Sequence, residues 1–307
     1  MRRSSGKTAF CFPGQLQERP RLDENPLLTA DLQFKECLSR VSGRTKFDLL
    51  RFSVEKERED PDLSLSLQIS TYLLSMIYFH RARAAGWAPD IFAEHSMGIY
   101  AALAAAEAVT FEEGLFITES IGKLLEREGR LHRGGMASII GLPLEEVEKI
   151  CRDLEGYQLV IANYNGSMQY VLSGEEEGIK NAISLALSRK AVSARELPFK
   201  TALHSPALSS LREEIMDLLR DVEVRSPKVP IINHWTVRPL GKEEIKDFLS
   251  QEIGRPVYWI RCVERLLQEG ITRFVEIGHE TTLTKLIRWV NRDVEAFSAG
   301  NGSYGKG

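Results

Sequence analysis

Cysteine is scarce in this chain and too scattered to build a site. The four cysteines, Cys11, Cys37, Cys151 and Cys262, lie far apart in 307 residues and form no CxxC pair. Structural zinc sites and disulfide frameworks both depend on closely patterned cysteines. We therefore expect no metal site of this type, four reduced thiols and a cytoplasmic protein.

Long hydrophobic runs and an excess of one charge are also absent. No apolar run approaches the roughly 20 residues that span a bilayer, and the basic segment 1–7 leads into no apolar stretch typical of a secretory signal. The 40 basic and 43 acidic residues leave a formal net charge of -3. Nothing in this balance points to nucleic acid. We expect neither a membrane nor a nucleic-acid partner.

The chain does contain a serine where a strand meets a helix. Residues 91–94 predict a short buried strand and residues 99–106 predict a helix, with Ser96 in the turn between them. Free N–H groups and the positive end of the helix dipole stabilise developing negative charge at such a turn. This is the place of the nucleophile in a G-x-S-x-G elbow. Serines also cap helices, and Glu94 replaces the first glycine of that pattern, so the turn alone leaves both roles open.

A candidate base follows much later in the chain. His204 lies in a loop after a predicted strand and before a helix predicted over residues 208–219. A histidine in reach of a serine can remove its proton and activate it as a nucleophile. The remaining histidines outside the Ser96 turn show no such pattern or metal-ligand spacing, and we expect them to be structural or exposed. They are His80, His132, His234 and His279.

The order of predicted elements indicates two α/β units. Residues 131–200 alternate as strand, helix, strand, strand, helix and strand, the βαββαβ order of a ferredoxin-like unit. Residues 8–130 and 201–297 predict one discontinuous α/β core with a mostly parallel sheet. Residues 298–307 are rich in Gly and Ser, and we expect a disordered tail there.

Seven short motifs, taken together, resemble the malonyl-CoA:acyl-carrier-protein transacylase family. Each is weak alone, but their order and spacing match the family over nearly the whole chain. The resemblance implies an α/β-hydrolase-like core with an inserted ferredoxin-like small domain and an active site in the cleft between them. The motifs are Phe10-Cys11-Phe12-Pro13-Gly14-Gln15, His95-Ser96-Met97-Gly98, Gly135-Met136-Ala137-Ser138-Ile139-Ile140-Gly141-Leu142, Ala162-Asn163-Tyr164-Asn165, His204-Ser205-Pro206, Arg255-Pro256-Val257-Tyr258-Trp259 and Phe274-Val275-Glu276-Ile277-Gly278.

The resemblance implies a role for each part of an acyl-transfer site. Ser96 would be the nucleophile and His204 its base, while the backbone N–H groups of Gln15 and Met97 would form the oxyanion hole. The family continues its first motif as Gly-Gln-Gly-Ser-Gln, whereas this chain has Gly-Gln-Leu-Gln-Glu over residues 14–18. We therefore expect an oxyanion loop of different shape.

Supporting residues follow from the same resemblance. His95 and Asn165 would pack or hydrogen-bond around the site. Backbone carbonyls would orient His204, and Glu252 stands where the family tends to carry glutamine. Its carboxylate either lies close to His204 and raises the pKa of that ring, or is solvated at a helix end. Gln68 either lines the acyl pocket or is an ordinary polar residue inside a helix.

The pocket lacks the arginine that selects malonyl groups. Members that transfer malonyl carry an arginine before a glycine on the helix after the elbow, and it pairs with the substrate carboxylate. Ile121 stands at that position, and Leu203 replaces a frequent phenylalanine. Burying an unpaired carboxylate costs several kcal/mol, so we expect an acyl group without one. Lys123 should point to another face of the helix.

The resemblance thus implies an acyl-CoA:acyl-carrier-protein acyltransferase that forms an acyl-Ser96 intermediate. A coenzyme A thioester would be its substrate, with no permanently bound cofactor. An acyl hydrolase that edits acyl carrier proteins with the same two residues is the alternative, and a non-catalytic docking protein is a third possibility. The basic residues Arg189, Lys190 and Lys200 predict a surface for the acidic carrier protein.

Overall fold

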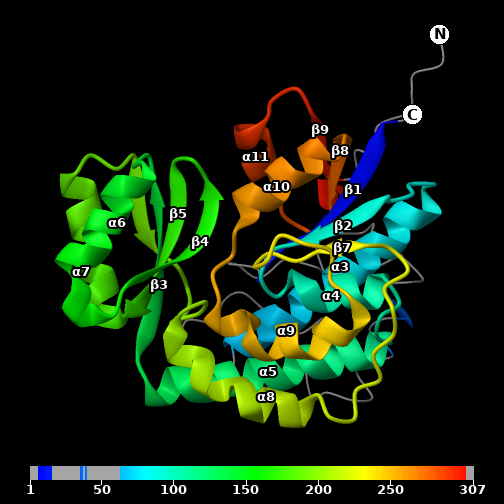
Figure 1. Cartoon of the computed structure of the whole chain (residues 1–307), viewed down its shortest axis with the longest axis horizontal. Helices are drawn as coiled ribbons and strands as arrows, with labels where there is room; N and C mark the ends of the chain where they lie inside the picture. Colours follow the sequence, from blue (N-terminus) through cyan, green and yellow to red (C-terminus); the bar gives the residue numbers. More distant parts are fainter. Residues whose placement is uncertain (1–5, 16–34, 37–38, 40–62, 302–307) are drawn as a thin grey trace.

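A parallel sheet forms the centre of the larger of two units (Figure 1). The structure is a computed structural model that describes residues 6–15, 35–36, 39 and 63–301. Among these residues the sheet has five strands in the order β7-β2-β1-β8-β9, and every neighbouring pair is parallel. The strands are β1 (Lys7–Phe12), β2 (Ile91–Glu94), β7 (Ile231–Ile232), β8 (Ile271–Glu276) and β9 (Glu295–Ser298).

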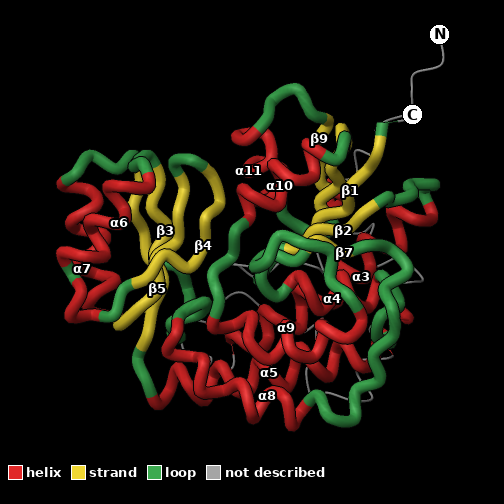
Figure 2. The backbone as a smooth tube through the Cα atoms, in the orientation of Figure 1, coloured by secondary structure: helices red, strands yellow, loops and turns green. Residues whose placement is uncertain are grey.

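Alternation along β1 creates a hydrophobic layer on each face of this sheet. Phe10 and Phe12 pack with one group of helices, and Ala9 and Cys11 pack with the other. Successive side chains of a strand point to opposite faces, so a strand covered on both faces is apolar throughout. The first group is α3 (Leu63–Ala84), α4 (Gly98–Ala105), α5 (Phe111–Leu131), α8 (Arg212–Leu218) and α9 (Ile245–Gln251); the second is α10 (Trp259–Gln268) and α11 (Thr282–Val290) (Figure 2).

The smaller unit is an antiparallel sheet covered by helices on the side turned away from the core (Figure 1). Its strands have the order β4-β5-β3-β6, which is the arrangement expected of a ferredoxin-like βαββαβ unit. The predicted fold class, an α/β core with a parallel sheet and a separate small sheet, is confirmed. The elements are β3 (Gly134–Ile140), α6 (Leu144–Asp153), β4 (Val160–Gly166), β5 (Gln169–Glu175), α7 (Glu176–Ser188) and β6 (Ser193–Glu196).

The C-terminal region differs from the prediction. Ser298 ends β9, a strand that the sequence analysis missed, and Ala299–Asn301 form a short 3-10 helix. Ala299 is buried in the core, which holds this segment in place. The prediction of a disordered tail is therefore wrong for residues 298–301, and residues 302–307 lie outside the described part. No helix in the described part is long and apolar enough to cross a membrane.

Backbone hydrogen bonds join the two units next to the site. Val257 donates to the carbonyl of Ala162 and accepts from the N–H of Tyr164, both at 2.8 Å. The segment before α10 therefore extends the edge of β4. This contact fixes the small sheet beside the loop that follows β2.

A close approach between β1 and the start of α4 sets the position of the elbow. A Cβ at Gly98 would lie 2.3 Å from the carbonyl oxygen of Phe12. The same carbonyl accepts a hydrogen bond from the N–H of His95 at 3.0 Å. Only a residue without a side chain allows both contacts.

We expect Gly98→Ala to lower the free energy of unfolding by more than about 2 kcal/mol, because the methyl group meets backbone rather than a movable side chain. Urea denaturation of the variant and of the wild type measures the difference. Gly156→Ala is the control, since a Cβ there meets nothing within 4 Å and should change stability by less than about 0.5 kcal/mol. Equal stability of Gly98→Ala and wild type would show that β1 and α4 can separate at little cost.

Candidate active site

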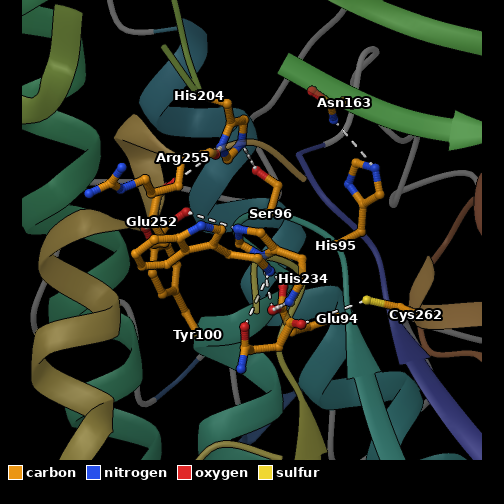
Figure 3. Close-up of polar contacts among 12 residues, drawn as sticks. Glu94, His95, Ser96, Tyr100, Asn163, His204, His234, Glu252, Arg255 and Cys262 are labelled. Atoms are coloured by element: carbon orange, nitrogen blue, oxygen red, sulfur yellow. Dashed lines mark hydrogen bonds and ion pairs between the residues drawn. The ribbon is translucent and has the colours of Figure 1, made fainter. Parts of the chain in front are cut away.

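Ser96 lies in the turn between β2 and α4 with a left-handed backbone, φ 58°. A serine in this strained conformation is typical of a nucleophile elbow, because the turn exposes the hydroxyl at the helix N-terminus. Its Oγ lies 2.7 Å from Nε2 of His204 (Figure 3). The structure thus brings together the two residues that the sequence motifs singled out.

Backbone carbonyls orient the His204 ring. Its Nδ1–H donates to the carbonyl oxygens of Arg255 at 2.9 Å and Glu252 at 3.1 Å. A proton on Nδ1 leaves the lone pair of Nε2 to accept from the Ser96 hydroxyl. Burial, together with the charge of nearby His234, lowers the pKa of His204 to about 3. The ring is therefore neutral at physiological pH and able to take a proton.

The Glu252 carboxylate lies near the His204 ring, within 4.8 Å, but hydrogen-bonds to Tyr100. It is 1% exposed, and its Oε1 accepts a hydrogen bond from the Tyr100 hydroxyl at 2.7 Å. The interpretation as a solvated helix-end glutamate is wrong, because the side chain is enclosed by the core. The expectation that this carboxylate raises the pKa of His204 is also wrong, because burial dominates and the pKa is lowered.

The two predicted oxyanion donors lie beside Ser96 in one cavity. Gln15 and Met97 both line it. Among the described residues, the backbone N–H of Met97 has no hydrogen-bond acceptor, as expected of a donor at a helix start. The Gln15 side chain reaches toward Ser64, with Nε2 3.4 Å from its Oγ. Residues 16–18, where the sequence departs from the family, lie outside the described part.

The cavity has a volume of about 400 Å³ and takes its walls from both units. Of the three residues predicted for the acyl pocket, Gln68 and Leu203 line this cavity, whereas Ile121 is 1% exposed in the core and is not among the described lining residues. Leu125, one turn further along α5, lines the cavity instead. Lys123 points away and pairs with Glu119 at 2.6 Å.

His95 ties the elbow to the small sheet. Its Nε2–H donates to Oδ1 of Asn165 in β4 at 2.9 Å, and the side-chain amide of Asn163 lies 3.4 Å from the same nitrogen. Burial lowers the pKa of His95 to about 4. The ring is therefore neutral and holds the serine turn against β4.

The sequence analysis missed a buried ionic contact close to Ser96 and His204. His234, fully buried, donates from Nδ1 to the carboxylate of Glu94 at 2.8 and 2.9 Å (Figure 3). Glu94 ends β2 and His234 follows the end of the neighbouring parallel strand β7 by two residues, with Ala93 opposite Ile232. Strands that end at one edge of a sheet bring such side chains together. The pairing of β2 with β7 could have indicated this contact. However, β7 has only two residues, which is too short for a clear periodicity in the sequence.

One group of side chains has the spacing of metal ligands. Atoms of His204, His234 and Glu252 lie within 4.8 Å of one another. Both ring nitrogens of His204 are already occupied by hydrogen bonds to Ser96 and to carbonyl oxygens. We therefore assign no metal to this group.

The sequence pattern of the acyl transferase domain family matches residues 66–299. The chain belongs to this family. Among its relatives is the polyketide biosynthesis malonyl CoA-acyl carrier protein transacylase PksC of Bacillus subtilis (strain 168), which is 29% identical over 289 residues, or 94% of this chain and 98% of PksC. The acyl transferase family resemblance inferred from the motifs is confirmed.

Solved structures of similar proteins share the fold over almost the whole chain. The malonyl CoA-acyl carrier protein transacylase of Coxiella burnetii has a TM-score of 0.88 at 28% identity, covering 96% of this chain and 94% of its own. A malonyl-transacylase in complex with its type II PKS acyl-carrier protein has a TM-score of 0.86 at 25% identity and covers 95% of both chains. This acyl transferase therefore has both the sequence pattern and the architecture of that group.

We expect acylation of Ser96 by a neutral ester to be nearly independent of pH between about pH 5 and 8. A base with a lowered pKa keeps its lone pair as the pH falls and loses it only near its own pKa. Single-turnover rates with p-nitrophenyl acetate measure this. A rate that falls tenfold per pH unit below about pH 6.5 would show that His204 titrates like an ordinary histidine.

Proposed function

We propose that the chain transfers an acyl group from a coenzyme A thioester to an acyl carrier protein through an acyl-Ser96 intermediate. The 2.7 Å contact between Ser96 Oγ and the neutral Nε2 of His204, inside a cavity shared by both units, carries this proposal. The relatives support the substrate class, because their names describe transacylases of acyl carrier proteins.

The first half-reaction forms the intermediate. Ser96 Oγ attacks the thioester carbonyl carbon while His204 Nε2 takes the hydroxyl proton. The N–H groups of Gln15 and Met97 stabilise the oxyanion, and loss of one such donor typically costs about 100- to 1,000-fold in rate. The carbon–sulfur bond then breaks, and the thiolate of coenzyme A leaves with the proton from His204.

The second half-reaction reverses these steps with a new thiol. The phosphopantetheine thiol of the carrier protein gives its proton to His204 Nε2 and attacks the ester carbonyl. The carbon–oxygen bond of the intermediate breaks, and Ser96 regains its proton from His204. One thioester is consumed and one is formed, so no cofactor is needed.

We further propose that the acyl group lacks a free carboxylate. Gln68, Leu125 and Met136 line the cavity and are buried, and none of them carries a charge. Ile121, at the position of the family's arginine, is apolar and lies in the core rather than in this lining, and Lys123 is paired with Glu119. Acetyl, propionyl or longer saturated groups fit this lining better than malonyl.

Two cations of the cavity lining are suited to the phosphate of the pantetheine arm. Arg195 comes from β6 of the small unit and Lys285 from α11 of the core, and both are exposed. Neither side chain makes a hydrogen bond or an ion pair within the described residues. Of the surface proposed from sequence, Lys190 and Lys200 are exposed, but Arg189 is engaged with Asp153 and Glu146. We therefore propose a basic surface made of Lys190, Lys200, Arg195 and Lys285, without Arg189.

The proposed intermediate is tested by intact-mass spectrometry with acetyl-CoA, propionyl-CoA and malonyl-CoA. We expect the wild type to gain the mass of the acyl group, with acetyl or propionyl loading faster than malonyl, because the buried lining residues Gln68, Leu125 and Met136 offer a carboxylate no charged partner. Ser96→Ala should gain no mass and should keep the wild-type melting temperature. Addition of holo acyl carrier protein should then move the acyl group to the carrier.

Three results would contradict this assignment. An adduct that persists in Ser96→Ala places the nucleophile elsewhere. Faster loading of malonyl overturns the proposed preference. If the acyl group is released as free acid, and no acylated carrier protein forms at the same carrier concentration, the protein is the editing hydrolase.

We expect Arg195→Gln and Lys285→Gln each to raise KM for acyl-CoA by about tenfold, because each removes one charge-assisted contact to phosphate. The rate with p-nitrophenyl acetate, which has no phosphate, should stay unchanged. Lys180→Gln is the control, since this lysine is exposed on α7 and pairs with Glu176. Unchanged KM in both test variants would place the phosphate elsewhere.

A further inference from the structure

The buried ionic contact between Glu94 and His234 takes no part in the proposed acyl-transfer steps. The backbone N–H of His234 donates to Glu94 Oε1 at 2.7 Å, and the ring Nδ1–H donates to both carboxylate oxygens. Glu94 and His234 are each 0% exposed. A carboxylate in contact with a buried imidazole stabilises the positively charged form of the ring.

The other ring nitrogen of His234 faces a second carboxylate. Its Nε2 lies 4.0 Å from Oε2 of Glu252. Both atoms are buried and make no hydrogen bond with the described residues. Two lone pairs facing each other in a dry site would repel, so one proton must lie between them. The nitrogen is the better place for it, because Glu94 already stabilises a positive ring.

We propose that His234 is held as a buried imidazolium between Glu94 and Glu252, and acts as a positioning residue that fixes the loop orienting His204 and keeps His204 neutral. The proposal rests on the proposed role of His204 as the base. The arrangement of Glu94, His234 and Glu252, however, does not depend on which acyl group or carrier protein the enzyme uses.

The positioning effect follows from the hydrogen bonds. Glu252 and Arg255 supply the two carbonyl oxygens that accept from His204 Nδ1. The Glu252 side chain is held by Tyr100 and by the charge on His234, while the carbonyl of His234 accepts from the N–H of Tyr258 at 2.8 Å. His234 therefore contacts the orienting segment on both sides.

The electrostatic effect follows from proximity. The rings of His204 and His234 lie edge to face with centroids 5.7 Å apart. A positive charge at this distance in a buried site disfavours a second one on His204. Burial lowers the pKa of His234, but the charge of Glu94, its hydrogen bond and the charge of Glu252 together outweigh burial and raise it. Burial raises the pKa of Glu252 to about 7, against the opposing effects of His234 and Tyr100.

Other titratable groups around His234 do not supply the charge. His95 is neutral, because burial lowers its pKa and the charge of His234 lowers it further. Tyr100 and Cys262 are neutral, because burial raises the pKa of each well above its usual value. Phe248 of α9 packs edge to face on the His234 ring and excludes water from that side. The only cation of the group is therefore His234 itself.

The charge on His234 is tested directly by ¹⁵N NMR of the imidazoles in the full-length protein. We expect one buried histidine to give imidazolium shifts at both nitrogens from pH 5 to pH 8, and this signal to disappear in His234→Asn. Neutral shifts for His234 at pH 7 would overturn the proposal. Elemental analysis is run on the same sample, and a stoichiometric divalent metal would also overturn it.

The effect on His204 is tested by the pH profile of Ser96 acylation with p-nitrophenyl acetate. In His234→Asn, whose amide can still donate to Glu94, we expect the ratio of the rate at pH 4.5 to that at pH 8 to fall about threefold or more below the wild-type ratio, as the pKa of His204 rises. A rate lowered equally at both pH values would indicate only a structural role and would overturn the proposal.

Two further variants keep the test decisive. The double variant Glu94→Gln/His234→Asn removes both charges, so no unpaired charge is left buried. It is used if His234→Asn alone does not fold, and the same change in the rate ratio is expected. His132→Asn is the matched control, because His132 faces Glu128 at 3.9 Å on the surface and should leave the ratio unchanged. A wild-type enzyme that shows the imidazolium but never acylates Ser96 would refute the proposed function and leave the charge on His234 established.

Discussion

The structure depends on the narrow space between the end of β1 and the start of α4. Gly98 fits there because a Cβ would lie 2.3 Å from the Phe12 carbonyl oxygen, and that carbonyl also holds the N–H of His95. Ser96 is confined between these two contacts and takes a left-handed backbone that few serines adopt. The hydroxyl is thus fixed before any substrate arrives, which removes an orientational cost from the reaction.

Local patterns made the elbow and the two sheets predictable. Strand β1, the turn at Ser96 and the alternating strands and helices of the small unit are encoded within short windows of sequence, where apolar periodicity and turn residues agree. The pairing of Ser96 with His204 was also foreseen, but only through the order of family motifs. Nothing in the spacing of these two residues sets their distance.

Features that depend on contacts between distant segments could not be read from the sequence. β9 was missed because Glu295–Ser298 gains its stability from pairing with β8 rather than from its own pattern. Glu94 was noted only as a departure from glycine, and His234 as a histidine without a pattern. The structure gives a joint reason for both, since neighbouring strand ends place a carboxylate beside an imidazole. The direction of the Glu252 side chain likewise depends on Tyr100, which lies on another element.

His204 is oriented by backbone carbonyl oxygens and not by a carboxylate, and this determines how it acts as a base. In a triad, a carboxylate next to the base stabilises the imidazolium that forms during the reaction. His204 has only neutral carbonyl oxygens at Nδ1, so the imidazolium receives less stabilisation and returns its proton readily. Each half-reaction needs His204 to accept a proton and release it again to a thiolate or to Ser96. A base of low proton affinity slows the first of these steps and favours the second, which suits an enzyme whose intermediate must be formed and consumed by groups of similar reactivity.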